Sequence, residues 1–165
     1  MKKRVMLAFL FFVVGMASPF FTYGFFRKTI QDVYVWGTSG KVQFFGKEFY
    51  LFFSPYYYIA LAFLFTVFIL RNFQRKTSSI IKQFSLAVIL FFSTVFIISY
   101  VLANLALIEC TACEDGIKPL HYNAIPYSSI LKLAALVAAI PSLLLLFKEG
   151  RLLKFWKASR ARNKP

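Results

Sequence analysis

Cysteine, histidine and carboxylate side chains gather in one short segment, ALIECTACEDGIKPLHYN, at residues 106–123. The segment holds both cysteines of the chain, Cys110 and Cys113, its only histidine, His121, and three of its six acidic residues. Two cysteines separated by two residues can form a structural disulfide, exchange disulfides with a partner, or bind a metal ion together with a histidine. Any covalent or metal chemistry of this chain is therefore expected in this segment.

A structural disulfide between Cys110 and Cys113 is the favoured interpretation. An extracytoplasmic position would be oxidising, although a ring this short removes only roughly 2 kcal/mol of unfolded-state entropy. The alternative is a thiol–disulfide exchange site, because short C-x-x-C rings are often strained and therefore reducible. The acidic neighbours Glu109, Glu114 and Asp115 disfavour a thiolate and argue against that alternative.

A metal site is the least favoured of the three interpretations. The spacing of Cys110, Cys113 and His121 is C-x2-C-x7-H, which is not a usual zinc spacing, and the chain has no second cysteine pair. A single histidine also excludes a self-contained bis-histidine haem site. We therefore expect no metal and no cofactor.

The composition indicates that these residues belong to a membrane protein. Of the 165 residues, 59% are hydrophobic and 22 are phenylalanine, whereas a soluble domain is about 45–50% apolar. A helix needs about 20 apolar residues to cross a bilayer, and four runs are long enough. They predict spans at residues 5–26, 51–70, 84–108 and 127–147, which we expect to form one all-α, up-and-down bundle of four transmembrane helices.

The lysine and arginine residues predict the orientation of these spans. The N-terminus, the loop at 71–83 and the tail at 148–165 carry 14 basic residues, whereas the loops at 27–50 and 109–126 together with Lys132 carry six. Because basic residues are enriched on the cytoplasmic side, we expect both termini in the cytoplasm of a cell with a bacterial inner membrane. The net charge of +14 is explained by this topology, so the lipid bilayer and not a nucleic acid is the expected partner.

The first outer loop carries the pattern of a small β-hairpin. Residues 33–36 are β-branched and aromatic, GTSG at 37–40 supplies turn residues, and KVQFF resumes at residue 41. The aromatic content exceeds what a soluble loop needs, so we expect this loop to pack against helices and lipid headgroups or to bind a protein. The candidate binding residues are Tyr34, Trp36, Phe44 and Phe45.

Lys132 is the one ionisable residue inside a predicted span, about five residues into the fourth. At 1.5 Å per residue it lies roughly 8 Å below the outer surface, which is shallow enough for its ammonium group to reach the headgroups. An ion pair between Glu109 and Lys132 at the outer rim is the alternative hypothesis.

Two function classes remain, and a membrane protein is the expected partner in the first. The sequence has no Walker, G-x-S-x-G or H-E-x-x-H motif, which favours a non-enzymatic binding or accessory protein, such as a subunit of a membrane complex or an immunity or exclusion protein. In size, in its four spans and in its basic inner loop and tail, the chain resembles several colicin immunity proteins, a likeness of architecture. The alternative is a thiol-redox membrane protein using Cys110 and Cys113. Quinone-linked disulfide oxidases share the four-helix topology but use two cysteine pairs, so this chain would need a second protein for electron relay.

Overall fold

The computed structural model describes residues 2–47, 55–72, 77–108 and 117–148. Four long helices dominate these residues, and two short strands and a 3-10 helix lie between them. The helices are α1 (Lys2–Gly37), α2 (Pro55–Asn72), α3 (Thr77–Ile108) and α4 (Tyr127–Lys148); the short elements are β1 (Val42–Phe45), β2 (Lys118–His121) and η1 (Tyr122–Ala124). Each long helix contains an apolar stretch of membrane-spanning length, at Val5–Thr22, Pro55–Asn72, Ser79–Ile108 and Tyr127–Phe147. The chain is thus a helical, multi-pass membrane protein, as the hydropathy predicts.

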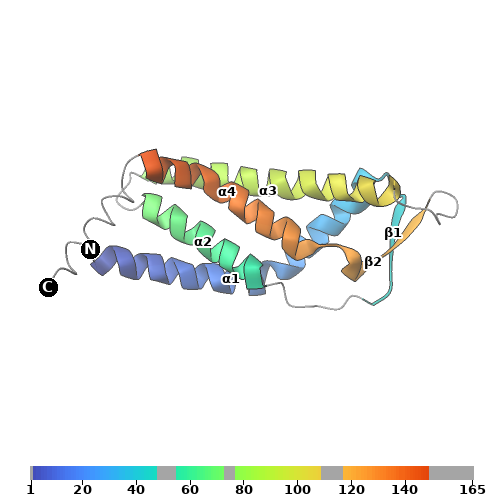
Figure 1. Cartoon of the computed structure of the whole chain (residues 1–165), viewed down its shortest axis with the longest axis horizontal. Helices are drawn as coiled ribbons and strands as arrows, with labels where there is room; N and C mark the ends of the chain where they lie inside the picture. The colour runs from blue at the N-terminus through green and yellow to red at the C-terminus, as the bar shows by residue number, and fades with distance from the viewer. Residues whose placement is uncertain (1, 48–54, 73–76, 109–116, 149–165) are drawn as a thin grey trace.

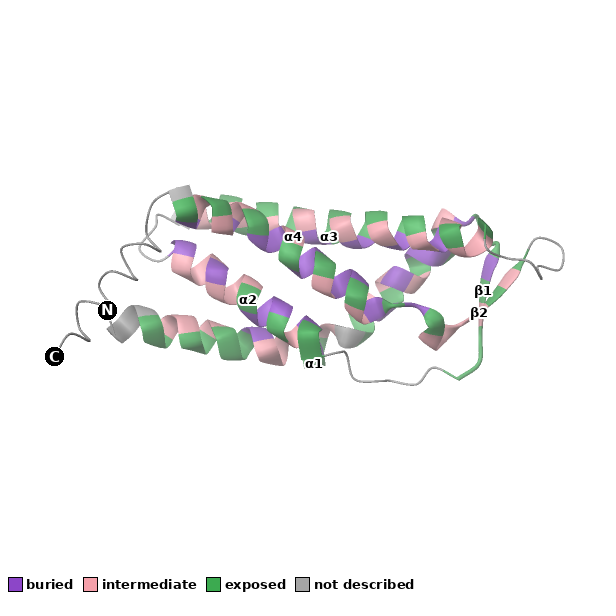
Figure 2. Cartoon of the chain, viewed as in Figure 1, coloured by how far each residue is buried: buried purple, intermediate pink, exposed green. Residues whose placement is uncertain are grey.

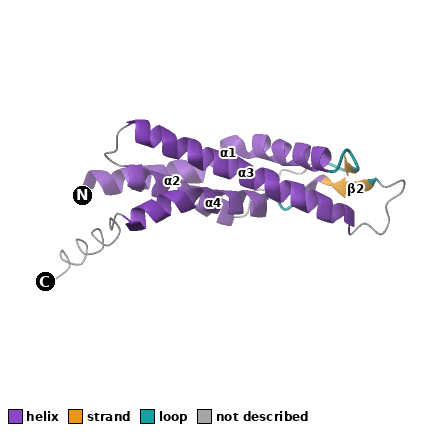
Figure 3. Cartoon of the chain, turned by 90° about the horizontal axis from the view of Figure 1, so that it is seen from above, coloured by secondary structure: helices purple, strands orange, loops and turns teal. Residues whose placement is uncertain are grey.

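The helices form a bundle whose two ends differ (Figure 1). The beginning of α1 and the end of α4 lie together at one end, which we call the terminal end. Strands β1 and β2 lie at the opposite end, which we call the loop end. Seen from above, the four helices run along the same long axis (Figure 3).

Helix α4 contributes most of the small residues in the core. Ala134, Ala135, Ala138 and Ala139 are almost completely buried, and such small side chains let helix backbones approach closely inside a bilayer. Larger side chains close the core around them, including Tyr57 of α2. The outward faces of α1 and α3 carry many exposed apolar residues (Figure 2), as expected where helices meet lipid and not water.

Helix α1 continues through Pro19 without a break in its assigned residues. Proline lacks the N–H that would bond the carbonyl four residues earlier, which here belongs to Gly15. The Ser18 hydroxyl donates to the Gly15 carbonyl oxygen at 2.9 Å, and the Thr22 hydroxyl donates to that of Ser18 at 3.0 Å. These side-chain bonds satisfy backbone groups at membrane depth, where water is not available to do so.

The predicted hairpin between residues 33–36 and 41–45 is wrong, because residues 33–36 belong to the last turns of α1. Ile30, Val33 and Tyr34 are buried at helical spacing, so the apolar pattern there is that of a helix face. The GTSG turn residues end the helix: the Gly40 N–H donates to the Val35 carbonyl at 2.9 Å and the Ser39 N–H to that of Trp36 at 3.1 Å. This pair of bonds, with Ser39 at φ 53°, is a Schellman C-cap.

The strand in the first loop pairs with the second loop instead. β1 and β2 are parallel, with Val42 opposite Lys118 and Phe45 opposite His121. A two-residue turn cannot join parallel strands, so this pairing connects two loops that are far apart in sequence. The EFYLFF stretch that follows, at residues 48–53, lies outside the described residues.

Candidate functional site

Polar side chains from three segments meet at the loop end. The last turns of α1 provide Arg27 and Gln31, η1 provides Asn123, and the first turn of α4 provides Tyr127. The C-terminal part of α1 reaches this region because it runs on beyond its most apolar stretch and packs on α3 (Figure 1). Only two residues, Ile125 and Pro126, connect η1 to α4. This short connection brings Asn123 and Tyr127 to the same side of α1.

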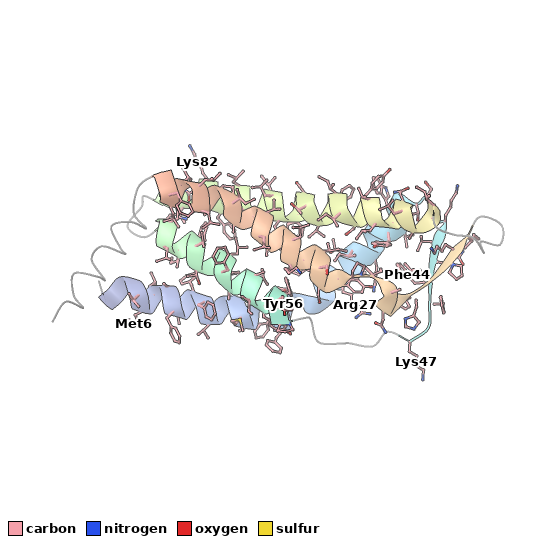
Figure 4. The ribbon with its side chains drawn as sticks, in the orientation of Figure 1. Met6, Arg27, Phe44, Lys47, Tyr56 and Lys82 are labelled. Atoms are coloured by element: carbon pink, nitrogen blue, oxygen red, sulfur yellow. The ribbon has the colours of Figure 1, made fainter. Side chains whose placement is uncertain are left out.

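Arg27 is the central cation of this cluster and is only 2% exposed. Its Nη2 donates to the Asn123 Oδ1 at 2.7 Å, and its Cζ lies 4.6 Å from the centroid of the Tyr127 ring. A guanidinium combines planar donors with a face that stacks on aromatic rings, and a cation–π contact is worth about 2 kcal/mol when it is desolvated. Arg27, which is labelled in Figure 4, therefore joins α1 to η1 and α4.

Tyr127 connects the same elements through its hydroxyl. The Gln31 Nε2 donates to the Tyr127 hydroxyl at 3.0 Å, and that hydroxyl donates to the Tyr122 carbonyl at 2.8 Å. The tyrosine thus accepts from α1 and donates to η1, as a phenol can do. We call Arg27, Gln31, Asn123 and Tyr127 the loop-end network.

His121 links the network to the strand pair. Its Nδ1 accepts from the Asn123 N–H at 3.1 Å and caps η1. Its ring also contacts Phe45 edge-on, with centroids 5.6 Å apart. Gly46 adopts φ +86°, and a Cβ there would lie 2.6 Å from the imidazole, so a residue without a side chain is required at this contact.

Two further side chains support the strands. The Lys118 Nζ donates to the Ala106 carbonyl near the C-terminus of α3, where helix carbonyls lack partners and a cation is favourable. The Thr38 hydroxyl donates to the Tyr34 carbonyl at 2.7 Å and accepts from the Val42 N–H at 3.3 Å. Thr38 thereby ties the end of α1 to the start of β1.

The four aromatic residues predicted to bind a partner occupy different environments. Tyr34 is 3% exposed in the core, where burial and, to a smaller extent, the neighbouring Tyr127 raise its pKa to about 12. Phe44 is half-buried and stacks on Tyr122 with centroids 5.1 Å apart. Trp36 is 66% exposed and Phe45 is 52% exposed. Trp36 and Phe45 are therefore the two that offer a surface, and Tyr34 lies beneath it.

The remaining predicted residues are only partly described. The Lys132 Nζ lies 5.9 Å from the ring centroid of Tyr56 on α2, which is itself exposed. The Tyr56 side chain is labelled in Figure 4. Cys110, Cys113 and Glu109 lie outside the described residues. The disulfide, the redox alternative and the Glu109–Lys132 pair stay predictions.

The hydrogen bonds of the loop-end network use arginine, amide and phenol groups to join α1, η1 and α4. Within the described ranges, no three His, Cys, Asp or Glu side chains come together to hold a metal ion. The network thus connects the second loop to the helices at the loop end.

The sequence-based prediction missed Arg27, Gln31, Asn123 and Tyr127. A basic residue directly after an apolar run looks like an ordinary membrane flank, and nothing in its spacing identifies Asn123, 96 residues later, as its partner. The apolar spacing of Ile30, Val33 and Tyr34 was the available signal that α1 continues and that the residue one turn before Ile30 also faces the core.

The arrangement defines a multi-pass membrane protein whose two longer connections are bound to each other at one end of the bundle. Compared with known proteins, the chain matches no family model, and no curated protein and no solved structure shows significant similarity to it.

Proposed function

We propose that this chain is a small non-enzymatic protein of a bacterial inner membrane that binds a membrane-protein partner at its loop end. In this proposal both termini are cytoplasmic and the loop end is extracytoplasmic, because 14 of the 20 basic residues belong to the terminal-end segments. The chain would serve as an accessory subunit or as an immunity or exclusion protein.

The observation that carries the proposal is the exposure of Trp36 and Phe45 on a rigid support. Trp36 lies against Phe96 and Tyr100 of α3, with centroids 5.4 and 6.2 Å apart, and yet two thirds of its surface is free. Phe45 is held by the β1–β2 pairing and by the His121 ring. Large aromatic side chains on a preorganised support are the usual anchors of protein interfaces.

The position of Trp36 also permits a contact with lipid headgroups, since tryptophan is enriched at membrane interfaces. Phe45 lies on strand β1 and not on a membrane-spanning helix, so that explanation applies to it less directly. The two residues together, and Phe45 in particular, favour a protein partner.

Site-specific photo-crosslinking in intact cells tests the proposal. A photoreactive phenylalanine analogue replaces Phe45 in the full chain, and Met6 on α1 at the terminal end, which is also strongly exposed, provides the matched control position. We expect one discrete protein adduct from position 45, absent from position 6 and lost when Trp36→Ser is added. Adducts to lipid alone at position 45, or an adduct that Trp36→Ser leaves unchanged, would contradict the proposal.

The thiol-redox alternative rests on Cys110 and Cys113 alone. Strand β2, which begins at Lys118, is fixed to β1 and to the end of α3, so the segment 109–117 that contains the cysteines joins two anchored points. A disulfide with a purely structural role would suit a segment anchored in this way equally well. The anchoring therefore does not favour the thiol-redox alternative, which stays second.

A further inference from the structure

A groove runs along the bundle between the N-terminal half of α1 and the N-terminal half of α3, with α2 as its floor. It has a volume of about 290 Å³. Leu64 and Phe65 lie on its floor, Phe11 and Thr22 on its α1 wall, and Ala87 and Phe91 on its α3 wall. Apart from Phe26, the residues of the floor and of both walls belong to the apolar stretches of membrane-spanning length, so we place the groove at the depth of the lipid chains.

The groove exists because α1 leaves α3 on one side of its proline. Toward the loop end, α1 packs on α3 through Phe26, whose ring centroid lies 5.2 Å from that of Phe91. Before Pro19, α1 follows α2 instead (Figure 1). Gly15 lets the backbones approach so closely there that an added Cβ would lie 2.6 Å from the Cα of Ala62. Among the described helices, none consequently fills the space opposite α2.

The length of the groove indicates what can lie in it. Phe11 and Thr22 mark a length of roughly 16 Å along α1, and Phe84 and Phe92 one of roughly 12 Å along α3, at 1.5 Å per residue. A stretch of acyl chain that lies along the groove can contact all three helices over this length.

The chemistry of the walls agrees with such an occupant. The lining is almost entirely carbon, and its two hydroxyls, those of Ser18 and Thr22, already donate to carbonyls of α1. Helices in membranes associate through small residues, and phenylalanine predominates here. The groove is also continuous with the lipid-facing surface, since Phe84, Val88 and Phe92 on its α3 rim are exposed. A chain lying in it gains dispersion contacts on three sides.

We propose that this groove is a binding site for one acyl chain of a membrane phospholipid. The lipid is held by shape and dispersion contacts within the bilayer, at a site separate from Trp36 and Phe45. It fills the space between α1 and α3 and so supports the different packing of the two halves of α1. This site is independent of the partner-binding function proposed above.

Native mass spectrometry of the full chain, purified in detergent from its own membrane, tests the site. We expect one phospholipid retained per wild-type chain and loss of that lipid in Ala87→Phe, which fills the groove. Ser85→Phe adds a similar bulk on an exposed position of the same helix and should retain the lipid. Val88→Phe, at the exposed rim, provides a second blocking variant if Ala87→Phe does not fold, and re-addition of phosphatidylglycerol to delipidated protein should restore the complex in wild type only.

Three results would overturn the inference. The first is a wild-type chain that retains no phospholipid and does not recover one on re-addition. The second is a blocking variant that is folded and retains the lipid as well as Ser85→Phe does. The third is retention of an isoprenoid or of a polypeptide that Ala87→Phe or Val88→Phe releases, which would assign the groove to a different ligand.

Discussion

Arg27 is a buried cation, and its neighbours explain how the fold tolerates it. A charge that leaves water needs hydrogen bonds and favourable electrostatic contacts, and Arg27 has the Asn123 amide oxygen and the Tyr127 ring. Both partners lie far from Arg27 in the sequence, Asn123 being 96 residues later. Arg27 therefore fixes how the second loop sits on α1, which in turn places β2 beside β1.

Arg27→Leu should destabilise the protein. The substitution leaves the half-buried Asn123 oxygen without its donor, which costs about 1–3 kcal/mol, and removes the cation–π contact, worth about 1–2 kcal/mol. We expect the free energy of unfolding in detergent to fall by about 2–4 kcal/mol. Lys28→Leu, at the exposed adjacent position, is the matched control and should change it by less than about 0.5 kcal/mol. Equal effects of the two substitutions would show that the Arg27 contacts do not stabilise the fold.

Tyr34 should make stability depend on alkaline pH. Its pKa rises from 10.0 in the unfolded chain to about 12 in the folded protein, because burial disfavours the phenolate. A raised folded pKa contributes stability that is complete below pH 10 and is lost as the pH rises through about 12. The thermal unfolding temperature should therefore fall across this window, and it should fall less steeply in Tyr34→Phe. Parallel profiles for the two proteins would argue against a buried phenol at this position.

At the scale of single elements, α1 shows how one helix can serve two neighbours. Its first half is drawn to α2 at Gly15, its second half packs on α3 at Phe26 and Trp36, and Pro19 lies between the two regions. Proline is tolerated inside a membrane helix where other groups satisfy the freed carbonyl, which Ser18 does here. The different packing of the two halves of α1, and the groove beside it, thus follow from Gly15, Ser18 and Pro19, which lie close together in the sequence.

The two glycines of α1 provide a direct test of this packing. Gly15→Ala would place a methyl group 2.6 Å from the Ala62 Cα, so α1 and α2 must separate, at a cost of about 1–3 kcal/mol. A methyl group at Gly24 meets nothing within 4 Å, and Gly24→Ala should stabilise the helix by up to about 1 kcal/mol. Unfolding in detergent would measure both effects. Two substitutions that change stability in the same direction would contradict the close approach at Gly15.

The strand pair shows why the hairpin prediction failed. Period-2 and period-3.6 patterns are hard to distinguish over four residues such as VYVW, and a C-cap uses the same glycine and serine residues as a turn. The 41–45 strand was correctly expected in part, since β1 is Val42–Phe45. Its partner could not be identified from the sequence, because KPLH at 118–121 contains a proline and no alternation.

At the scale of the whole molecule, the described helices agree with the four hydropathic runs, while the orientation in the membrane and the state of the cysteines stay predictions. Both can be tested in one experiment on intact cells. If the loop end is extracytoplasmic and Cys110 and Cys113 form a disulfide, a membrane-impermeant maleimide should modify them only after a mild reductant has been added. Modification without reductant would exclude the disulfide, and modification only in permeabilised cells would reverse the proposed orientation.

The sequence by itself determined that this is a four-helix membrane protein, because burying apolar runs of about 20 residues in a bilayer is a local property of each run. The sequence also identified Trp36 and Phe45 as candidate binding residues, which stays a prediction. Only the tertiary structure decided that Arg27 meets Asn123 and Tyr127, that β1 pairs with β2, and that a groove lies between α1 and α3. These features depend on contacts between residues distant in sequence, on the packing of the two halves of α1 against different helices, and on the volume left between packed helices. Hydrophobicity and turn propensity describe each segment separately and therefore do not predict these features.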